Sequence, residues 1–241
     1  MDFPDLLRLI DERATAFRTA VAAAPTLDAP VPTCPGWTLA DLVTHLANGR
    51  RKWASIIAAG PADAPPPQPS EPADLTEATQ QLLEALREAG PDRGCWGWWE
   101  DSQSPLTAGA AARHQVQEIA VHTYDAQLTI GAPQPLPTAV ALDGIEDFLL
   151  TCCATTSPWP HTPATVDYQT TEGPGWRLHL STDGARAERL PASGPASASA
   201  TATAAASDLE LILYGRLPVT TAKLNGDSTI FDQLIAWDPS A

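Results

Sequence analysis

Apolar residues recur every three or four positions along the first part of the chain, which is the period of an amphipathic α-helix. The first run ends before Pro25 and consists of Leu7, Ile10, Ala14, Phe17 and Val21. A second helical pattern extends to about Gly60, and Thr38 and Asp41 stand at its start. That spacing is typical of a capping box, in which the two side chains satisfy early backbone amides. The sequence therefore predicts two helices before Gly60.

Two more helices are predicted in the first half of the chain. One runs from roughly Leu75 to Ala89, and the other includes residues 113–126, which contain no Pro or Gly. The proline-rich stretch 61–74 cannot be helical, so we expect an extended surface loop there. Four helices joined by loops predict a helix bundle over residues 1–133.

The loop over residues 90–105 holds three tryptophans in four positions, Trp96, Trp98 and Trp99. Such a concentration of aromatic area is too costly to leave in water. We expect the loop to fold over the bundle or to line the mouth of a pocket. Trp37, just before the second helix, could also wall a pocket, but a packing role at the helix start is the more common one.

The second half of the chain predicts a small α+β domain over residues 134–241. A helix is expected from Val140 to Cys153, with one apolar face. Residues 164–171 and 175–182 alternate between apolar and polar positions and are separated by a Glu-Gly-Pro turn, which indicates a β-hairpin. The fold class is thus two-domain, a four-helix bundle followed by an α+β domain.

The Ala- and Ser-rich stretch 196–206 could be mistaken for a linker. Its alternation fits a strand with small inward-facing residues instead. We expect this strand to lead into a helix capped by Ser207 or Asp208, two residue types that accept hydrogen bonds from early helical amides.

Composition excludes several classes of partner. The formal net charge of the 241-residue chain is −15, a field that repels nucleic acid and anionic lipid surfaces. No apolar run approaches the roughly 18 residues of a membrane span, and the N-terminus lacks a signal-peptide pattern, so a cytoplasmic protein is expected. The four cysteines, without zinc-ribbon spacing, are expected to be reduced. A monomer or weak homodimer is the expected assembly.

Glu118 and His122 stand four residues apart in the fourth predicted helix. Residues at this spacing project from one face about 6 Å apart along the axis, so they can converge on one cation. His45, in the second helix, is the best candidate for a third ligand. Two nitrogens and one oxygen suit zinc with an open fourth position. His114 is a rival, but it lies about 12 Å along the axis from His122, so one of the two is a bystander.

Asp125 follows His122 by three residues and could orient its imidazole ring. An exposed acid at the helix end and a salt bridge to another domain are equally compatible with the sequence.

Four elements together resemble the mycothiol-dependent maleylpyruvate isomerase family. They are the CPGW element before the second helix, His45 within DLVTHLANG, the Glu118 and His122 pair, and the SDLELILYGRLP segment. The resemblance covers essentially the whole chain. It implies a DinB-like four-helix bundle that binds a divalent metal, usually zinc, and a small C-terminal domain similar to sterol-carrier modules. It also implies that His45, Glu118 and His122 are the metal ligands, which leaves His114 as the bystander.

The resemblance further implies an enzyme with mycothiol, a low-molecular-weight thiol, as cosubstrate. A metal-held thiolate would add to the cis double bond of maleylpyruvate, and rotation and elimination would give fumarylpyruvate. In an S-transferase the thiolate would instead stay attached to an electrophilic small molecule. Both reactions need a group for an anionic substrate, and Arg216 in LYGRLP is the expected carboxylate-binding residue. The family also places a functional arginine there, although Arg216 could simply cap the preceding helix.

Two other classes of function remain open. In the first, zinc-bound water replaces the thiol in a hydrolase or lyase. In the second, the chain is a non-catalytic binding protein whose C-terminal domain holds a lipid or a partner. The complete ligand set argues against the second class, because a buried glutamate and two histidines without metal would cost stability.

Overall fold

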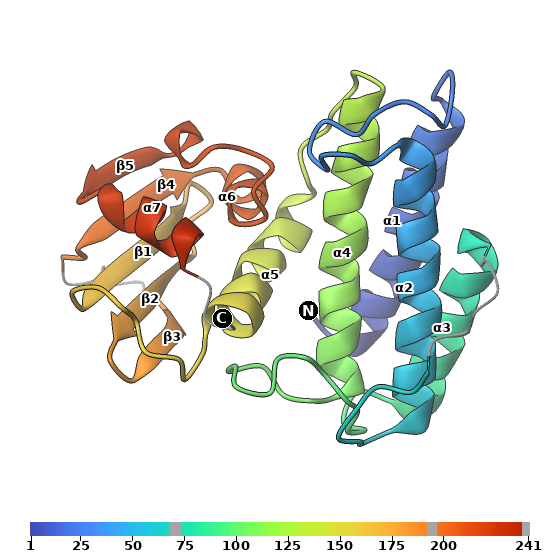
Figure 1. The fold of residues 1–241 in the computed structure, drawn as a ribbon, viewed down its shortest axis with the longest axis horizontal. Coiled ribbons are helices and arrows are strands. Elements are labelled where there is room, and N and C mark those ends of the chain that lie inside the picture. The colour runs from blue at the N-terminus through green and yellow to red at the C-terminus, as the bar shows by residue number, and fades with distance from the viewer. Residues whose placement is uncertain (68–73, 192–196, 238–241) are drawn as a thin grey trace. The chain divides into compact units, whose positions relative to one another are not determined.

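The structure is a computed structural model that describes residues 1–67, 74–191 and 197–237. The chain divides into two compact units (Figure 1). The first contains residues 1–98 and 106–136, and the second contains residues 99–105 and 137–241. The predicted order, a helical bundle and then a small α+β part, is confirmed.

The first unit is a bundle of four helices. They are α1 (Phe3–Ala22), α2 (Leu39–Ala59), α3 (Leu75–Ala89) and α4 (Ala108–Thr129). Helix α1 packs mainly on α4, and α2 packs mainly on α3. The apolar faces predicted from the sequence meet in a core that includes Phe17, Leu42, Leu46 and Ile119. In the predicted loop 61–74, residues 61–67 form no helix or strand, and residues 68–73 lie outside the described part.

Helix α4 is buried around most of its circumference. Thirteen of its 22 residues are buried, and many of them are alanines that let neighbouring helices approach closely. The other three helices each bury one face. A central helix of this kind places its polar side chains in the interior, where they must be paired.

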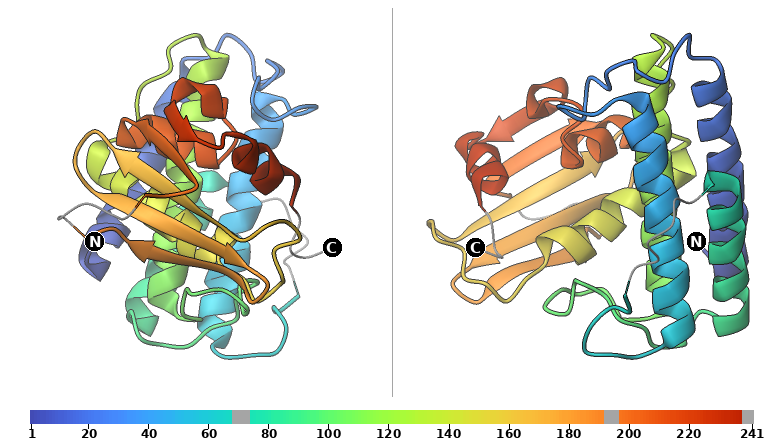
Figure 2. Two further views of the ribbon diagram at one scale, coloured as in Figure 1. Left: turned by 90° about the vertical axis from the view of Figure 1, so that its left-hand side faces the viewer. Right: turned by 45° about the vertical axis from the view of Figure 1, so that its right-hand side comes forward.

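The second unit contains a five-stranded sheet and three α-helices (Figure 2). The strands are β1 (Ala164–Thr170), β2 (Gly175–Ser181), β3 (Gly184–Arg189), β4 (Ala200–Ala204) and β5 (Lys223–Gly226). Their order is β3-β2-β1-β4-β5, and only the β1 and β4 pair is parallel. The helices are α5 (Thr138–Phe148), α6 (Ala206–Leu213) and α7 (Thr229–Ala236).

The two faces of this sheet differ in polarity, as period-two patterns predict. Val166 on β1 pairs with Leu178 on β2 and with Ala200 on β4, and all three are fully buried. On the opposite face Asp167 receives a bidentate hydrogen bond from Arg177, at 2.7 and 2.8 Å. The predicted hairpin and the small inward residues of the alanine-rich strand are both confirmed.

The predicted cap of helix α6 is wrong. The helix begins at Ala206, before Ser207 and Asp208, and neither of these residues caps it. The backbone N–H of Ala206 instead donates to the carboxylate of Glu172, at 3.1 Å from each oxygen. Glu172 lies in the turn between β1 and β2, so the cap is a tertiary contact.

The helix predicted from Val140 to Cys153 changes from an α-helix to a π-helix before its end. The α-helical part stops at Phe148, and Leu149–Cys153 form a π-helical turn. Strands β3 and β5 and helix α7 were not predicted. Strand β5 has four residues, none of them buried, so it carries little apolar signal.

The division of the chain also differs from the predicted boundary between residues 133 and 134. The units separate between Leu136 and Pro137, and residues 99–105 group with the second unit. Hydrogen bonds explain this grouping, because the side-chain amide of Gln103 pairs with both backbone groups of Ala187 on β3. Trp99, in the same segment, is buried and donates from its indole N–H to the carbonyl of Pro105.

Within the described ranges, no helix is both long enough and apolar enough to cross a bilayer. No disulfide joins any of the four cysteines, all of which lie within the described ranges.

Candidate metal centre

Helix α2 begins at a fully formed capping box. The backbone N–H of Asp41 donates to the Thr38 hydroxyl, and the backbone N–H of Thr38 donates to the Asp41 carboxylate at 2.8 Å. These bonds fix the start of the helix two turns before His45. The His45 ring also packs on Trp37, with ring centroids 4.9 Å apart. Trp37 therefore contributes to positioning His45 as well as to packing.

Helices α2 and α4 bring the three predicted ligands together. His45 Nε2 lies 2.8 Å from Glu118 Oε1, and His122 Nε2 lies 3.6 Å from the same oxygen. The two imidazole centroids are 5.2 Å apart. The side chains are 40% exposed for His45, 29% for Glu118 and 10% for His122, so the cluster opens toward solvent at one side.

Asp125 contacts the His122 ring at Nδ1, the nitrogen that faces away from Glu118. Asp125 Oδ2 lies 2.8 Å from His122 Nδ1, and the aspartate side chain is completely buried. With Nδ1–H donating to this carboxylate, Nε2 is the ring nitrogen on the Glu118 side, and it becomes available to a metal ion when its proton is lost. Asp125 also accepts a 2.6 Å hydrogen bond from the hydroxyl of Thr33 and a longer one, 3.8 Å, from the thiol of Cys34. The alternative of an exposed helix-end acid is therefore wrong.

The contact between Asp125 and the loop before α2 was not predicted. Thr33 and Cys34 belong to the loop that contains the CPGW element, and Asp125 lies 91 to 92 residues further along the chain. No spacing rule links such distant positions. The only available signal was the composition of the loop, which places a hydroxyl and a thiol beside a rigid Pro-Gly turn.

The charges of the cluster are strongly coupled. Burial raises the pKa of the Glu118 carboxyl, but the hydrogen bonds and charges of His122 and His45 outweigh it and hold this pKa well below its usual value. Burial lowers the pKa of His122, but the hydrogen bonds and charges of Asp125 and Glu118 outweigh it and raise the pKa to about 9. Without a metal, His122 is therefore a cation paired with two carboxylates at neutral pH.

The three side chains fit a divalent metal ion. One donor atom from each of His45, Glu118 and His122 lies within 4.8 Å of the other two. Ligands of a tetrahedral zinc ion stand about 3.4 Å apart, so a small opening of the His45 and Glu118 contact would admit the ion. The carboxylate that orients His122 is the usual companion of a metal-ligating histidine.

A second group of ligand-type side chains shares His122. Cys34, His122 and Asp125 also have donor atoms within 4.8 Å of one another. This group uses the Nδ1 side of the ring, where Asp125 is fully buried. His45 and Glu118, in contrast, line a pocket that a ligand can enter.

This pocket, which we call the bundle pocket, has a volume of about 420 Å³. Besides His45 and Glu118, its lining includes Arg50, Lys52, Trp53, Trp98, His114 and Gln115. Trp98 is half exposed at its rim, as expected for the tryptophan-rich loop, and its ring contacts that of His114 with centroids 5.7 Å apart. His114 belongs to neither group of ligand-type side chains, which supports its interpretation as a bystander.

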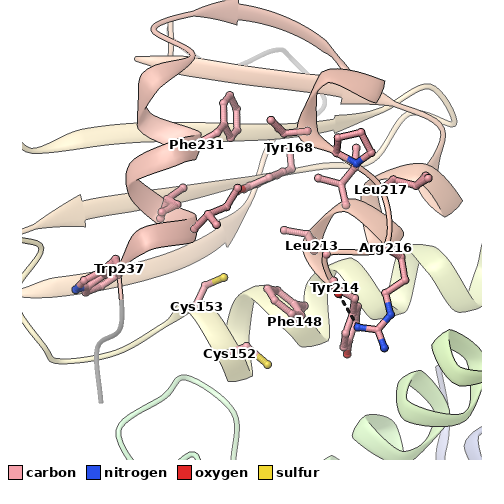
Figure 3. Close-up of a pocket in the computed structure, with 16 residues that line it drawn as sticks. Phe148, Cys152, Cys153, Tyr168, Leu213, Tyr214, Arg216, Leu217, Phe231 and Trp237 are labelled. Carbon is pink, nitrogen blue, oxygen red and sulfur yellow. Dashed lines mark hydrogen bonds between the residues drawn. The ribbon is translucent and has the colours of Figure 1, made fainter. Parts of the chain in front are cut away.

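Arg216 lies in the second unit, just after helix α6. Its Nη1 donates to the carbonyl of Tyr214, the residue that ends the helix, at 2.7 Å. The capping role considered from the sequence is therefore present. Arg216 also lines a mainly apolar cavity of about 770 Å³, which includes Phe148, Tyr168, Leu213 and Trp237. Figure 3 shows Arg216 and Trp237 at opposite ends of this cavity, with the guanidinium beside Tyr214.

The fold and the cluster together define a helix-bundle protein with a two-histidine, one-glutamate site and an additional α+β unit. The profile of the mycothiol maleylpyruvate isomerase N-terminal domain matches residues 7–127, and that of the corresponding C-terminal domain matches residues 139–233. The chain belongs to the mycothiol-dependent maleylpyruvate isomerase family, as the sequence resemblance predicted.

Solved structures agree with this assignment at the level of the fold. A crystal structure of the mycothiol-dependent maleylpyruvate isomerase matches with a TM-score of 0.54 and 12% identity over 90% of each chain. A crystal structure of a His-to-Ala mutant of such an isomerase matches with a TM-score of 0.56 and 11% identity over 93% of each chain. A search of curated protein sequences found no significant match.

Proposed function

We propose that this protein is a zinc enzyme that uses the thiolate of mycothiol to attack an electrophilic small molecule. The thiolate is either eliminated again after isomerisation of a cis double bond of the maleylpyruvate type, or it stays attached to the small molecule, as in an S-transferase. The observation that carries the proposal is the convergence of His45, Glu118 and His122 at the edge of the bundle pocket, in a chain that belongs to this family.

The residues present would hold the metal in a defined way. His45 and His122 would each donate a ring nitrogen, and Glu118 would donate a carboxylate oxygen. The low pKa of Glu118 keeps it ionised, and Asp125 keeps the correct nitrogen of His122 available. A divalent ion at this site would lower the pKa of a thiol bound to it, so that the thiolate prevails near neutrality.

Two of the protein's four cysteines, Cys95 and Cys153, are poor nucleophiles by comparison. Burial raises the pKa of the Cys95 thiol to about 11 and that of Cys153 to about 12. Both side chains are therefore protonated and weakly reactive near neutral pH. This favours a small-molecule thiol as the attacking group.

Arg216 is the residue that we propose to bind a carboxylate of the substrate. Its guanidinium is planar and always charged, which suits bidentate binding of a carboxylate. The hydrogen bond from Nη1 to the carbonyl of Tyr214 limits the rotation of the side chain.

The first experiment is metal analysis of the purified protein and of His45→Ala, together with calorimetric titration of mycothiol onto the zinc-loaded form. We expect about one zinc ion per chain, its loss in His45→Ala, and saturable thiol binding. The matched control is His114→Ala, which removes a histidine of the same pocket but no proposed ligand, and it should retain zinc.

The other possible outcomes of this experiment would each favour a different class of function. Zinc without mycothiol binding would favour a hydrolase or lyase that uses metal-bound water. Absence of metal after reloading without chelators would contradict the metal centre and leave a binding protein. Loss of zinc from His114→Ala but not from His45→Ala would show that the ligand set is wrong.

A further inference from the structure

Arg50, on helix α2, is a buried charged residue in the first unit. Its side chain is only 1% exposed, and none of its three guanidinium nitrogens has a hydrogen-bond partner. A buried charged group without hydrogen bonds is costly, and proteins retain one where a ligand or an ion completes it. Arg50 lines the bundle pocket together with His45 and Glu118.

The charge of this pocket is opposite to that of the chain. The sequence carries 29 acidic and 14 basic residues. Among the residues that line the bundle pocket, however, Glu118 is the one acid, and Arg50 and Lys52 are both cations. Because Glu118 already pairs with His45 and His122, the remaining charge of the pocket is positive. A pocket of this kind attracts anions.

A purely structural role for Arg50 would be to balance the charge of Glu118. The two groups do attract each other, and this attraction partly offsets the burial that lowers the pKa of Arg50 to about 10. Glu118, however, takes its short contacts from the two histidines, and no nitrogen of Arg50 forms a hydrogen bond with it. The five donors of the guanidinium therefore remain available.

We propose that the bundle pocket binds a carboxylate group through Arg50, beside the metal centre. The inference rests on the proposed function and narrows its substrate to acidic molecules that place a carboxylate next to the ligand cluster. Arg50 is itself one of the residues that line the pocket, and its three guanidinium nitrogens have no hydrogen-bond partner within the protein. Trp53 and Trp98 supply flat apolar surfaces for the rest of a small unsaturated acid.

The test uses the full-length, zinc-loaded protein and maleate, a simple cis dicarboxylate, as the probe. Maleate is titrated calorimetrically onto the wild type, Arg50→Gln and Arg51→Gln. Arg51 is the matched control, because it is the neighbouring arginine on the same helix and is not among the residues that line the pocket. We expect Arg50→Gln to weaken maleate binding about tenfold or more, and Arg51→Gln to change it less than about twofold.

Zinc content and mycothiol binding are measured on the same samples. A failure of the proposed function can then be distinguished from a failure of the proposed carboxylate site. In one outcome the wild type binds maleate through Arg50 and yet fails to bind zinc or mycothiol. That result would contradict only the proposed function. Equal maleate affinity in the wild type and a zinc-reloaded Arg50→Gln would overturn the carboxylate site and assign Arg50 to charge balance.

If Arg50→Gln does not fold, the wild type still decides the question. Maleate should then raise the melting temperature of the zinc-loaded wild type by more than its neutral diamide at the same concentration. Equal shifts from the acid and the diamide would overturn the proposal. Arg50→Lys, which keeps the charge but loses the planar fork, should bind maleate with intermediate affinity.

Discussion

At the scale of single residues, the cluster depends on side chains that do not themselves contact a ligand. Asp125 is completely buried and receives hydrogen bonds from Thr33 and Cys34, while it lies 2.8 Å from His122 Nδ1. It fixes both the tautomer and the orientation of the ring. The sequence suggested this role for Asp125, but the buried network that holds it in place came from the structure.

Replacing Asp125 by Asn should weaken zinc binding about 10- to 100-fold, because the amide can no longer hold the His122 tautomer through its charge. Competition with a chromogenic chelator measures the affinity. Thr33→Val, which removes one hydrogen bond to Asp125 and leaves the carboxylate, should have a smaller effect. An unchanged affinity in Asp125→Asn would contradict the orienting role of Asp125.

The raised pKa of His122 predicts how the stability of the metal-free protein depends on pH. The pKa is about 9 in the folded protein, above the ordinary value of 6.5, so the folded state binds the proton more tightly. This contribution is therefore fully present below about pH 6.5 and is lost as the pH rises through 9.

The measurement is the melting temperature of metal-free protein between pH 6 and 10, compared with that of His122→Gln. The difference between the two curves should shrink as the pH rises, because the variant has no proton to lose. A difference that is constant with pH would contradict the ion pair of His122 with Glu118 and Asp125.

At the scale of the elements, the helices of the bundle follow the sequence closely, and the small α+β unit does so less. The predicted bounds of α3 and the capping box of α2 are both confirmed. These features depend on local patterns, since apolar spacing and a cap three residues away are properties of one helix. The start of α6 was wrong because its cap comes from Glu172, in a turn more than 30 residues earlier.

Glu172→Gln should destabilise the second unit by about 0.5–1 kcal/mol, because the helix N-terminus loses a negative charge that accepts its first free amide. Chemical denaturation measures the change. Asp208→Asn is the comparison, since Asp208 is the acid that the sequence indicated as a cap and it forms no capping hydrogen bond. A larger loss in Asp208→Asn than in Glu172→Gln would contradict the cap.

At the scale of the whole molecule, the residues proposed for chemistry belong to different units. The proposed metal ligands lie on α2 and α4 of the first unit, and Arg216 follows α6 in the second. Metal binding and substrate binding should therefore be separable by mutation.

Arg216→Lys should retain zinc and mycothiol binding but raise the KM for an acidic substrate about tenfold or more, because lysine cannot form a bidentate pair with a carboxylate. Steady-state kinetics with a maleylpyruvate-type substrate gives kcat and KM separately. A loss of stability with unchanged kinetics would instead assign Arg216 to the cap of α6, through its hydrogen bond to Tyr214.

The sequence by itself determined the bundle, the hairpin, the family and the spacing of Glu118 and His122, because each depends on local periodicity or on a short motif. The tertiary structure decided which distant groups meet. It placed Thr33 and Cys34 against Asp125, Glu172 at the start of α6, and the unpaired Arg50 in the wall of the bundle pocket. Burial and contacts between distant positions arise only when the elements pack, so local patterns do not predict them.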